Sequence, residues 1–277
     1  MMTIPQAVAY LREKPQFAGL IRDAYLDADV VEAARRFTAS AEFCEVIRLV
    51  GDRVRSGVVL DLGAGAGVAS YAFAIAGAKM VYAVEPQLSD EVGAVARWRM
   101  AQGLPIYGIA AIGEQIPLPD ASVDVVFARQ VLHHIPEPAL AIRECTRVLR
   151  RGGALLATRE HVVDNHRQRR EFLASHPIHA LAGGENAFPL SAYRRAFLDA
   201  GLNLVLELGP WDSIINAFPE VRTAGELDGF PRAAMCRRLG LWGRVLSRVP
   251  GTIGLTWKWL RSRRRPGRLF SFLAYKP

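Results

Sequence analysis

The chain has 277 residues, of which 51% are hydrophobic, and its formal net charge is +8 at pH 7. This length suits one large domain or a core domain with an attached subdomain, and this hydrophobic fraction excludes a disordered chain. Cys44, Cys145 and Cys236 are widely spaced, so we expect neither a disulfide framework nor a metal site, and a reducing cytoplasmic location fits. The sequence shows neither a secretory signal nor the ~18 consecutive apolar residues of a transmembrane helix.

The positive charge is concentrated in the C-terminal fifth of the chain. Asp228 is the last acidic residue, and twelve Lys or Arg residues follow it, from Arg232 to Lys276. Residues 1–228 therefore carry 23 basic and 27 acidic residues, a balance of −4. Such a basic block indicates contact with a membrane surface, nucleic acid or a charged substrate, although a solvated basic face would look the same.

The predicted elements begin with helices over residues 5–50, where one apolar stripe recurs at helical spacing, formed by Ala41, Phe43, Cys44, Ile47 and Val50. Short apolar runs then predict strands, at 58–61, 80–84, 105–110, 123–128 and 154–158. Helices are expected between them, over 68–76, 88–102 and from about 138. This alternation predicts a parallel sheet with right-handed crossovers.

The second half of the chain departs from this rhythm. Residues 160–200 favour helices with a break at Gly183-Gly184, and strands are expected at 202–208 and 269–275. We therefore divide the chain into four segments: an N-terminal helical cap (1–55), an α/β core (56–211), a basic helical insert (212–267) and a final strand of the core sheet (268–277).

A glycine-rich turn follows the first predicted strand, in the sequence Asp61-Leu-Gly63-Ala64-Gly65-Ala-Gly67. Glycines there let the backbone approach a ligand closely. A dinucleotide-binding turn would place its third glycine at position 68, which is a valine. The carboxylate of Asp61 would also repel a pyrophosphate, whereas it would help to hold the ammonium and sulfonium groups of S-adenosylmethionine (SAM).

Glu85 ends the second predicted strand, 18 residues after Gly67. An acidic side chain at this point can accept hydrogen bonds from both hydroxyls of a ribose. The alternative is a solvent-facing carboxylate at a strand end, and the glycine-rich turn upstream favours the ribose.

Several stretches together resemble the class I SAM-dependent methyltransferases, and they cover about residues 56–160. They are the glycine-rich segment 58–67, Ala83-Val-Glu-Pro, Ile116-Pro-Leu-Pro-Asp-Ala-Ser-Val-Asp-Val-Val, Val131-Leu-His-His-Ile-Pro, and Ala141-Ile-Arg-Glu-Cys-Thr-Arg-Val-Leu-Arg-Arg-Gly-Gly. The resemblance implies an α/β fold of the Rossmann-like methyltransferase type. In this fold a seven-stranded, mostly parallel, doubly wound sheet ends in an antiparallel strand, here with N-terminal helices and a helical insert before that strand.

The resemblance also implies SAM as the cofactor, S-adenosyl-L-homocysteine as its product, and roles by position. The implied contacts are Asp61, Gly63, Ala64, Gly65 and Gly67 for the methionine part, Glu85 and Pro86 for the ribose, and Ala128, Arg129 and Gln130 closing over the cofactor. The family often has Gly-Asp-Ala where Ala111-Ile112-Gly113 stands. Contact with the adenine would then come from the backbone near Gly113 or from Glu114.

Methyl transfer to an oxygen needs an aligned acceptor and a base that removes its proton. The candidates at the carboxyl ends of strands four and five are His133, His134, Glu160 and His161. A histidine has a suitable pKa, and a neighbouring carboxylate can orient it. The alternative for each histidine is a packed, hydrogen-bonded structural role.

Residues 175–188 supply secondary candidates, because this loop-rich stretch is placed to cap an acceptor pocket. They are His176, His179 and Glu185.

Three functional classes compete. A small-molecule, glycan or lipid-linked hydroxyl acceptor is favoured by the histidine pair and the lid-like segment 160–200. An RNA methyltransferase has only the basic segment in its support, because the sequence lacks the NPPY or DPPF tetrapeptide that stacks a flipped base. A non-catalytic SAM-binding protein is the third class.

The basic insert interleaves Trp242, Trp257 and Trp259 with arginines. This pattern suits an interfacial segment that lies on an anionic membrane, here the inner membrane face. The alternative is a helical subdomain that packs its tryptophans onto the core, with its arginines in solvent or on a charged substrate.

Overall fold

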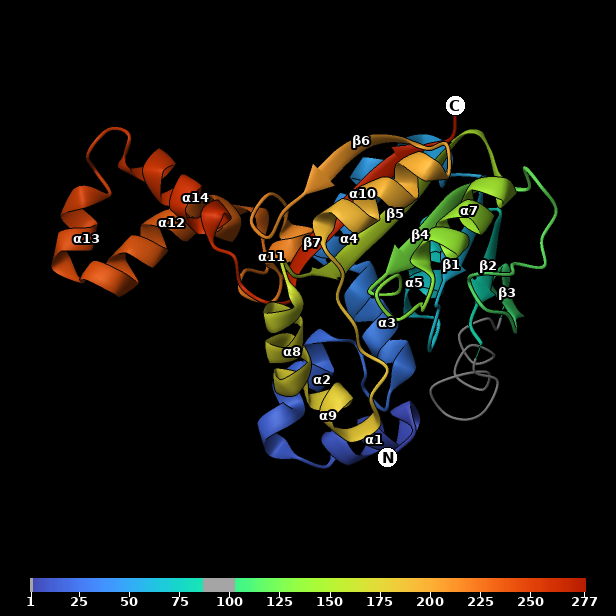
Figure 1. The fold of residues 1–277 in the computed structure, drawn as a ribbon, viewed down its shortest axis with the longest axis horizontal. Coiled ribbons are helices and arrows are strands. Elements are labelled where there is room, and N and C mark those ends of the chain that lie inside the picture. Colours follow the sequence, from blue (N-terminus) through green and yellow to red (C-terminus); the bar gives the residue numbers. More distant parts are fainter. Residues whose placement is uncertain (1, 87–102) are drawn as a thin grey trace.

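A computed structural model describes residues 2–86 and 103–277 of the chain (Figure 1). Its centre is a seven-stranded sheet with the strand order β3-β2-β1-β4-β5-β7-β6. The strands are β1 (Val58–Leu62), β2 (Met80–Val84), β3 (Ile106–Ile109), β4 (Val123–Arg129), β5 (Leu149–Val162), β6 (Asn203–Leu208) and β7 (Arg268–Tyr275). β7 runs antiparallel to both β5 and β6, and the other pairs are parallel. The predicted doubly wound, mostly parallel sheet is confirmed.

The helices precede, cover and follow this sheet. In chain order they are α1 (Ile4–Arg12), α2 (Ala18–Asp23), α3 (Val30–Thr38), α4 (Ala41–Val50), α5 (Val68–Ile75), α7 (Pro138–Val148), α8 (His166–Ser175), α9 (Pro177–Ala182), α10 (Leu190–Asp199), α11 (Ile214–Ala217), α12 (Ala224–Leu239), α13 (Leu241–Leu246) and α14 (Thr252–Ser262). The helix expected over residues 88–102 lies outside the described residues.

Both faces of the sheet are covered, because the central strands are apolar on both sides. Val59 and Phe127 pack in a core with α3, α4, α5 and α11. Leu60 and Ala128, their neighbours along the same strands, pack in a second core with α7 and α10. β1 and β4 are thus packed on both faces, and this packing fixes the position of the residues at their carboxyl ends.

The buried face of α4 differs from the predicted stripe. Its buried residues are Glu42, Phe43, Val46, Leu49 and Val50, whereas Cys44 is exposed. The face contains a charge because the carboxylate of Glu42 is paired with Arg129 inside the protein. An apolar pattern could not include that position, so the predicted stripe was rotated toward Cys44.

β5 is longer than the predicted strand at 154–158, and this changes the placement of two candidate residues. Beyond Thr158 the strand loses β4 as a neighbour and continues against β7, where Glu160 lies opposite Phe270 and His161 opposite Leu269. Arg159 has a φ of 61° at the shift in register. Glu160 and His161 are therefore part of β5 and extend past the end of β4, rather than lying in the loop that follows.

The N-terminal helices pack on the segment between β5 and β6. Val8, Leu11 and Ile21 from α1 and α2 form a small core with Ile178 and Leu181 of α9. α1, α2, α8 and α9 lie together beyond the carboxyl ends of the parallel strands (Figure 1). They enclose the end of the sheet at which Glu160 and His161 stand.

α12, α13 and α14 form an arm that projects away from the sheet, shown in orange and red in Figure 1. Pro250-Gly251 lies between α13 and α14. Several large apolar side chains of the arm are exposed, among them Leu241 at 75% and Trp242 at 74%. Among the residues that the structure describes, no helix is long and apolar enough to cross a membrane.

Candidate functional site

The glycine-rich turn between β1 and α5 has a backbone that only glycine adopts readily. Gly63, Gly65 and Gly67 have φ angles of 63°, 49° and 83°, all in the left-handed region. A Cβ on Gly63 would lie 2.5 Å from Cγ2 of Val131. Backbone conformation and close packing thus both require glycine at position 63, whereas the space beside Gly65 is open, with no atom within 4 Å of an added Cβ.

The two acidic candidates lie at this turn. Asp61 is buried in β1, and its Oδ2 accepts a 2.6 Å hydrogen bond from the Ser70 hydroxyl. Oε2 of Glu85 accepts a 3.1 Å hydrogen bond from the backbone N–H of Gly65. The fold thus brings Glu85 to the turn from the end of β2, 20 residues away in sequence. Pro86 follows it at the surface.

The remaining cofactor candidates differ in their surroundings. Ala128 is buried in β4, and Gln130 directly after the strand has a φ of 57°. A non-glycine residue in the left-handed region costs about 1–2 kcal/mol of conformational energy. Such strained residues are frequent at functional sites. Gly113 is buried, and a Cβ there would lie 2.9 Å from Cδ1 of Ile135, so close packing beside α7 also accounts for this glycine. Glu114 is half-buried in the loop after β3.

Arg129, the last residue of β4, is tied to the N-terminal helices. Its guanidinium donates to both carboxylate oxygens of Glu42, at 2.7 and 3.2 Å. The same guanidinium lies over the rings of Tyr25 and Phe37. Sequence patterns missed Glu42 and Tyr25, because neither belongs to a motif and Glu42 interrupts an apolar helix face.

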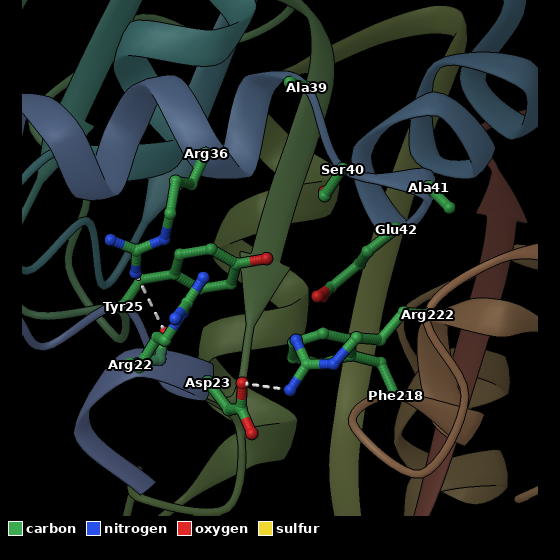
Figure 2. A pocket seen from close by; sticks show the side chains of 10 residues that line it. All are labelled: Arg22, Asp23, Tyr25, Arg36, Ala39, Ser40, Ala41, Glu42, Phe218 and Arg222. Carbon is green, nitrogen blue, oxygen red and sulfur yellow. Dashed lines mark hydrogen bonds and ion pairs between the residues drawn. The ribbon is translucent and has the colours of Figure 1, made fainter. Parts of the chain in front are cut away.

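A pocket of about 330 Å³ lies beside this ion pair (Figure 2). It is lined by Arg22, Asp23, Tyr25, Arg36, Ala39, Ser40, Ala41, Glu42, Phe218 and Arg222. Its aromatic walls, Tyr25 and Phe218, stack with their ring centroids 6.2 Å apart. Two of its cations are already paired, Arg222 with Asp23 and Arg36 with Asp27. The pocket therefore offers an aromatic, partly charged cavity next to the end of β4.

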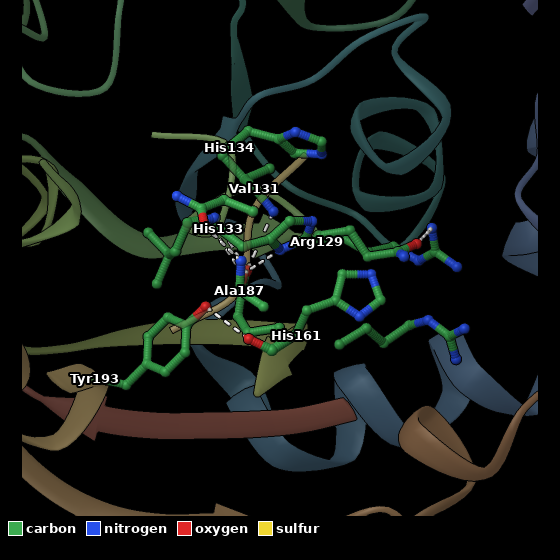
Figure 3. Close-up of polar contacts among 12 residues, drawn as sticks. Arg129, Val131, His133, His134, His161, Ala187 and Tyr193 are labelled. Carbon is green, nitrogen blue, oxygen red and sulfur yellow. Dashed lines mark hydrogen bonds and ion pairs between the residues drawn. The ribbon is translucent and has the colours of Figure 1, made fainter. Parts of the chain in front are cut away.

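Glu160 organises the loop that follows β4. Its carboxylate accepts hydrogen bonds from the backbone N–H groups of Val131, Leu132 and His133 at 3.0–3.1 Å. It also accepts a 2.7 Å bond from Nδ1 of His133 (Figure 3). With four donors on a fully buried carboxylate, Glu160 positions the loop and His133 and is not available to a ligand.

Three histidines meet at this point. The ring of His133 lies 4.3 Å from that of His134 and 4.6 Å from that of His161, measured between centroids (Figure 3). Nδ1 of His134 hydrogen-bonds to the Gly184 carbonyl at 3.1 Å, and Nδ1 of His161 to the Gly267 carbonyl at 2.9 Å. A carbonyl can only accept, so both rings carry their proton on Nδ1 and present Nε2 as an acceptor.

The pKa values of these histidines differ in direction. Burial acts to lower the pKa of His133, but the carboxylates of Glu160 and Glu185 outweigh it and raise the pKa to about 9. Burial, followed by the charge of His133, lowers the pKa of His134. The same two causes lower the pKa of His161 to about 3. At neutral pH, His133 is therefore a cation, whereas His134 and His161 are neutral.

Glu185, in the loop before α10, completes the cluster. Its Oε2 lies 3.6 Å from Nε2 of His133 and 3.8 Å from Nε2 of His134, and its Oε1 lies 3.7 Å from Nδ1 of His176. We call His133, His134, His161, His176, Glu160 and Glu185 the histidine cluster. The fold thus joins the secondary candidates His176 and Glu185 to the primary ones. His179 lies one turn further along α9, with a buried Nδ1 that has no hydrogen-bond partner.

Residues 60–157 match the family model of the methyltransferase domain. An uncharacterized methyltransferase of Mycobacteroides abscessus is 37% identical over 103 residues, which are 37% of this chain and 39% of that protein. The ubiquinone biosynthesis O-methyltransferase of Xylella fastidiosa is 34% identical over 102 residues, 36% of this chain and 40% of that protein. The chain thus spans about two fifths of the length of these relatives.

Among solved structures, a geranyl diphosphate methyltransferase in complex with SAM has a TM-score of 0.59 with this chain. The two are 17% identical, and the likeness covers 90% of this chain and 88% of that one. The fold and the matched segment agree. Residues 60–157 carry a methyltransferase domain, and the chain has the fold of SAM-dependent methyltransferases.

Domains of this family use SAM, and the residues at the turn of this methyltransferase domain fit it. The three left-handed glycines keep side chains out of the turn, the space beside Gly65 is open, and the carboxylate of Glu85 bonds to the turn at that residue. Asp61 adds a negative charge below the same turn. A cationic ligand with a ribose suits a turn without side chains that has two carboxylates, Asp61 and Glu85, beside it.

Proposed function

We propose that this chain is a methyltransferase that transfers the methyl group of SAM to a hydroxyl group of a small molecule, a glycan or a lipid-linked acceptor, with a histidine as the base. The observation that carries this proposal is the histidine cluster, which lies at the carboxyl ends of β4 and β5. β4 pairs with β1, and the glycine-rich turn follows β1. In sheets of this type, ligands bind beyond the carboxyl ends of the strands.

Among the candidate bases, His134 has the properties that the reaction requires. Its side chain is 37% exposed, whereas that of His133 is 1% exposed. Its Nδ1 proton is held by the Gly184 carbonyl, so Nε2 is free to accept a proton from an acceptor hydroxyl. His133 lies between two carboxylates and is protonated at neutral pH, which prevents it from acting as a base. Glu160 and His133 then act by positioning the loop that bears His134.

SAM supplies a carbon that is already activated by the sulfonium, so the protein needs only to align the acceptor and to take up its proton. The hydroxyl oxygen forms the new bond to the methyl carbon while the bond from that carbon to sulfur breaks, and the proton passes to Nε2 of His134. S-adenosyl-L-homocysteine and a methyl ether leave. The neutral state of His134 supports this role, because a cationic imidazole could not accept the proton.

We infer that the acceptor binds in the pocket beside Arg129 and is therefore of modest size. A volume of about 330 Å³ is at the lower end of small-ligand pockets, which range over about 300–1,000 Å³. Its walls of Tyr25 and Phe218 suit a partly apolar molecule. Calorimetry with SAM, S-adenosyl-L-homocysteine and NAD, followed by methyl-transfer assays on a panel of hydroxylated acceptors, tests the proposal.

We further infer that the arm formed by α12, α13 and α14 binds an anionic membrane surface. Exposed Leu241, Trp242 and Leu255 stand among basic residues, and the last acidic residue of the chain, Asp228, lies near the start of α12. Trp259 is 40% exposed, with the guanidinium groups of Arg238 and Arg263 over its ring. Exposed apolar groups with an excess of positive charge around them suit the headgroup region of a bilayer. Co-sedimentation with liposomes tests this inference.

A further inference from the structure

Part of the histidine cluster has no role in the proposed proton transfer. His161 on β5, His176 before α9 and Glu185 before α10 place one ligand atom each within 4.8 Å of the others. The Nδ1 of His176 is buried and makes no hydrogen bond in the structure. Oε2 of Glu185 makes none either, and its ion-pair contact with Nε2 of His133 is 3.6 Å long. Buried polar atoms are normally paired, so two such atoms in one small cluster need an explanation.

The surroundings orient these side chains as the surroundings of a metal site do. A metal-binding histidine usually donates its second ring N–H to a carbonyl or carboxylate, which fixes the tautomer and the ring. His161 makes this contact through Nδ1 to the Gly267 carbonyl, which directs Nε2 to the cluster. Oε2 of Glu185 faces His133, whose Nδ1 is held in turn by Glu160. The carboxylate is thus oriented through a chain of two residues.

We propose that His161, His176 and Glu185 bind a divalent first-row transition ion such as Zn²⁺. Two imidazoles and one carboxylate are a ligand set of catalytic zinc sites, which keep a further position open for water or substrate. With metal–ligand bonds of about 2.0–2.2 Å, the ligand atoms of a tetrahedral site lie roughly 3.3–3.6 Å apart. Nδ1 of His176 and Oε1 of Glu185 are 3.7 Å apart, so this pair needs only a small approach, while His161 must close a distance of up to 4.8 Å.

A second trio, His133, His134 and Glu185, also has its ligand atoms within 4.8 Å of one another. His133 suits a metal less well, because it lies between two carboxylates, with Nδ1 2.7 Å from Glu160 and Nε2 3.6 Å from Glu185. Both of its nitrogens are thus placed to donate. The trio with His161 and His176 also leaves His134 free for the proton transfer. The metal site goes beyond the proposed function, and metal binding can be tested independently of methyl transfer.

The experiment uses the full chain without a polyhistidine tag, stripped with a chelator and then titrated with Zn²⁺ and with Co²⁺. Calorimetry should show one ion per chain, and bound Co²⁺ should give the visible absorption of a low-coordinate site. His176→Ala and Glu185→Gln should each weaken binding by more than the roughly 10–100-fold that is lost when a side chain hydrogen-bonded to a metal ligand is removed. His179→Ala is the matched control from the same helix, and its affinity for both ions should equal that of the wild type.

SAM binding and circular dichroism of each variant, measured in parallel, show whether the variant is folded. If the wild-type chain binds neither ion at micromolar concentrations, the site does not exist. If His134→Ala abolishes binding and His176→Ala does not, the ion lies in the other trio and the assignment is wrong. A chain that binds the ion but not SAM would refute the proposed function and leave the metal site intact.

Discussion

The carboxylate of Glu42 on α4 accepts two hydrogen bonds from the guanidinium of Arg129 at the end of β4, and both side chains are largely shielded from water. The pair joins the N-terminal helices to the strand whose following loop bears the histidine cluster. Removing one partner of a buried bidentate pair strongly destabilises the folded state, because the other charge stays buried and unpaired.

We therefore expect Glu42→Ala to lower the free energy of unfolding by about 3–5 kcal/mol, because Arg129 would lose its counter-charge. Urea unfolding at pH 7 measures this change. Glu45→Ala is the control, since Glu45 is on the same helix but pairs with Arg48 at the surface, where such pairs contribute about 0–1 kcal/mol. Equal losses in the free energy of unfolding of the two variants would show that the buried pair contributes no more to stability than the surface pair.

Glu85→Ala should weaken the binding of SAM by about 2–4 kcal/mol, tens- to hundreds-fold in affinity, because two charge-assisted hydrogen bonds to the ribose would be lost. Calorimetry on the purified proteins measures the affinity, and NAD should not bind to either. Glu137→Ala, which removes an exposed carboxylate at the start of α7, should bind SAM as the wild type does. Unchanged affinity in Glu85→Ala would disprove the cofactor assignment.

His134→Ala should slow methyl transfer by about 10²–10⁴-fold, with SAM affinity nearly unchanged, because the base would be gone while the turn stays intact. The measurement is a single-turnover rate on whichever acceptor the panel identifies. His166→Ala, at the exposed start of α8, is the control and should keep its rate. A loss of only a few-fold in both His134→Ala and His133→Ala would mean that alignment alone suffices, as for a nitrogen or carbon acceptor.

The three thiols should differ widely in reactivity. Burial, followed by the charge of Glu144, raises the pKa of Cys145 to about 12, whereas Cys44 is exposed. Since the thiolate is the reactive form, we expect a thiol reagent at pH 8 to modify Cys44 at least about 10³-fold faster than Cys145. Mass spectrometry of peptides after timed labelling measures both rates.

The same shift carries a pH dependence of stability. The pKa of Cys145 is raised in the folded state, so its contribution to stability is complete below the unfolded value, about 8.5, and is lost as the pH rises toward 12. Cys145→Ala should therefore flatten the fall in stability above pH 9. An equally steep fall in this variant would contradict the assignment.

For the arm, we expect the chain to sediment with liposomes that contain phosphatidylglycerol at low salt and to stay in solution with phosphatidylcholine alone. Each Lys or Arg near an anionic surface contributes about 1 kcal/mol, and the arm holds most of the twelve. The double variant Leu241→Ser, Trp242→Ser should lower the bound fraction several-fold. Leu198→Ser, which removes an apolar side chain of similar exposure on α10, should have no effect. Recovery in the supernatant with both lipids would refute the membrane inference.

The α/β core could be predicted from the sequence because its signals are local. The apolar run of β2 coincides with the strand residue for residue, and a turn with three left-handed glycines demands those glycines. The contact of Glu85 with that turn could be predicted as well, since parallel strands end at the same edge of a sheet.

The rest of the site depends on contacts between distant segments. The extension of β5 that holds Glu160 and His161 exists because β7, more than 100 residues later, pairs with it. From the sequence, Glu42 would be assigned to the surface, because its buried partner Arg129 is 87 residues away in the chain. Glu185 and His176 lie in a stretch without periodicity, and only tertiary packing brings them to His161. A pattern in one segment holds no information on a partner in another.

The arm leaves the sheet after β6 and returns at β7, two neighbouring antiparallel strands on which Leu208 lies opposite Ser271. Topologically it is the long loop of a hairpin, and the entropy of closing such a loop grows by only about 0.6 kcal/mol for each doubling of its length. Evolution can therefore enlarge, trim or replace this segment while the sheet stays the same. The proposed membrane contact of the arm and the proposed chemistry of the sheet can therefore evolve separately, and a protein engineer could exchange the arm without redesigning the sheet.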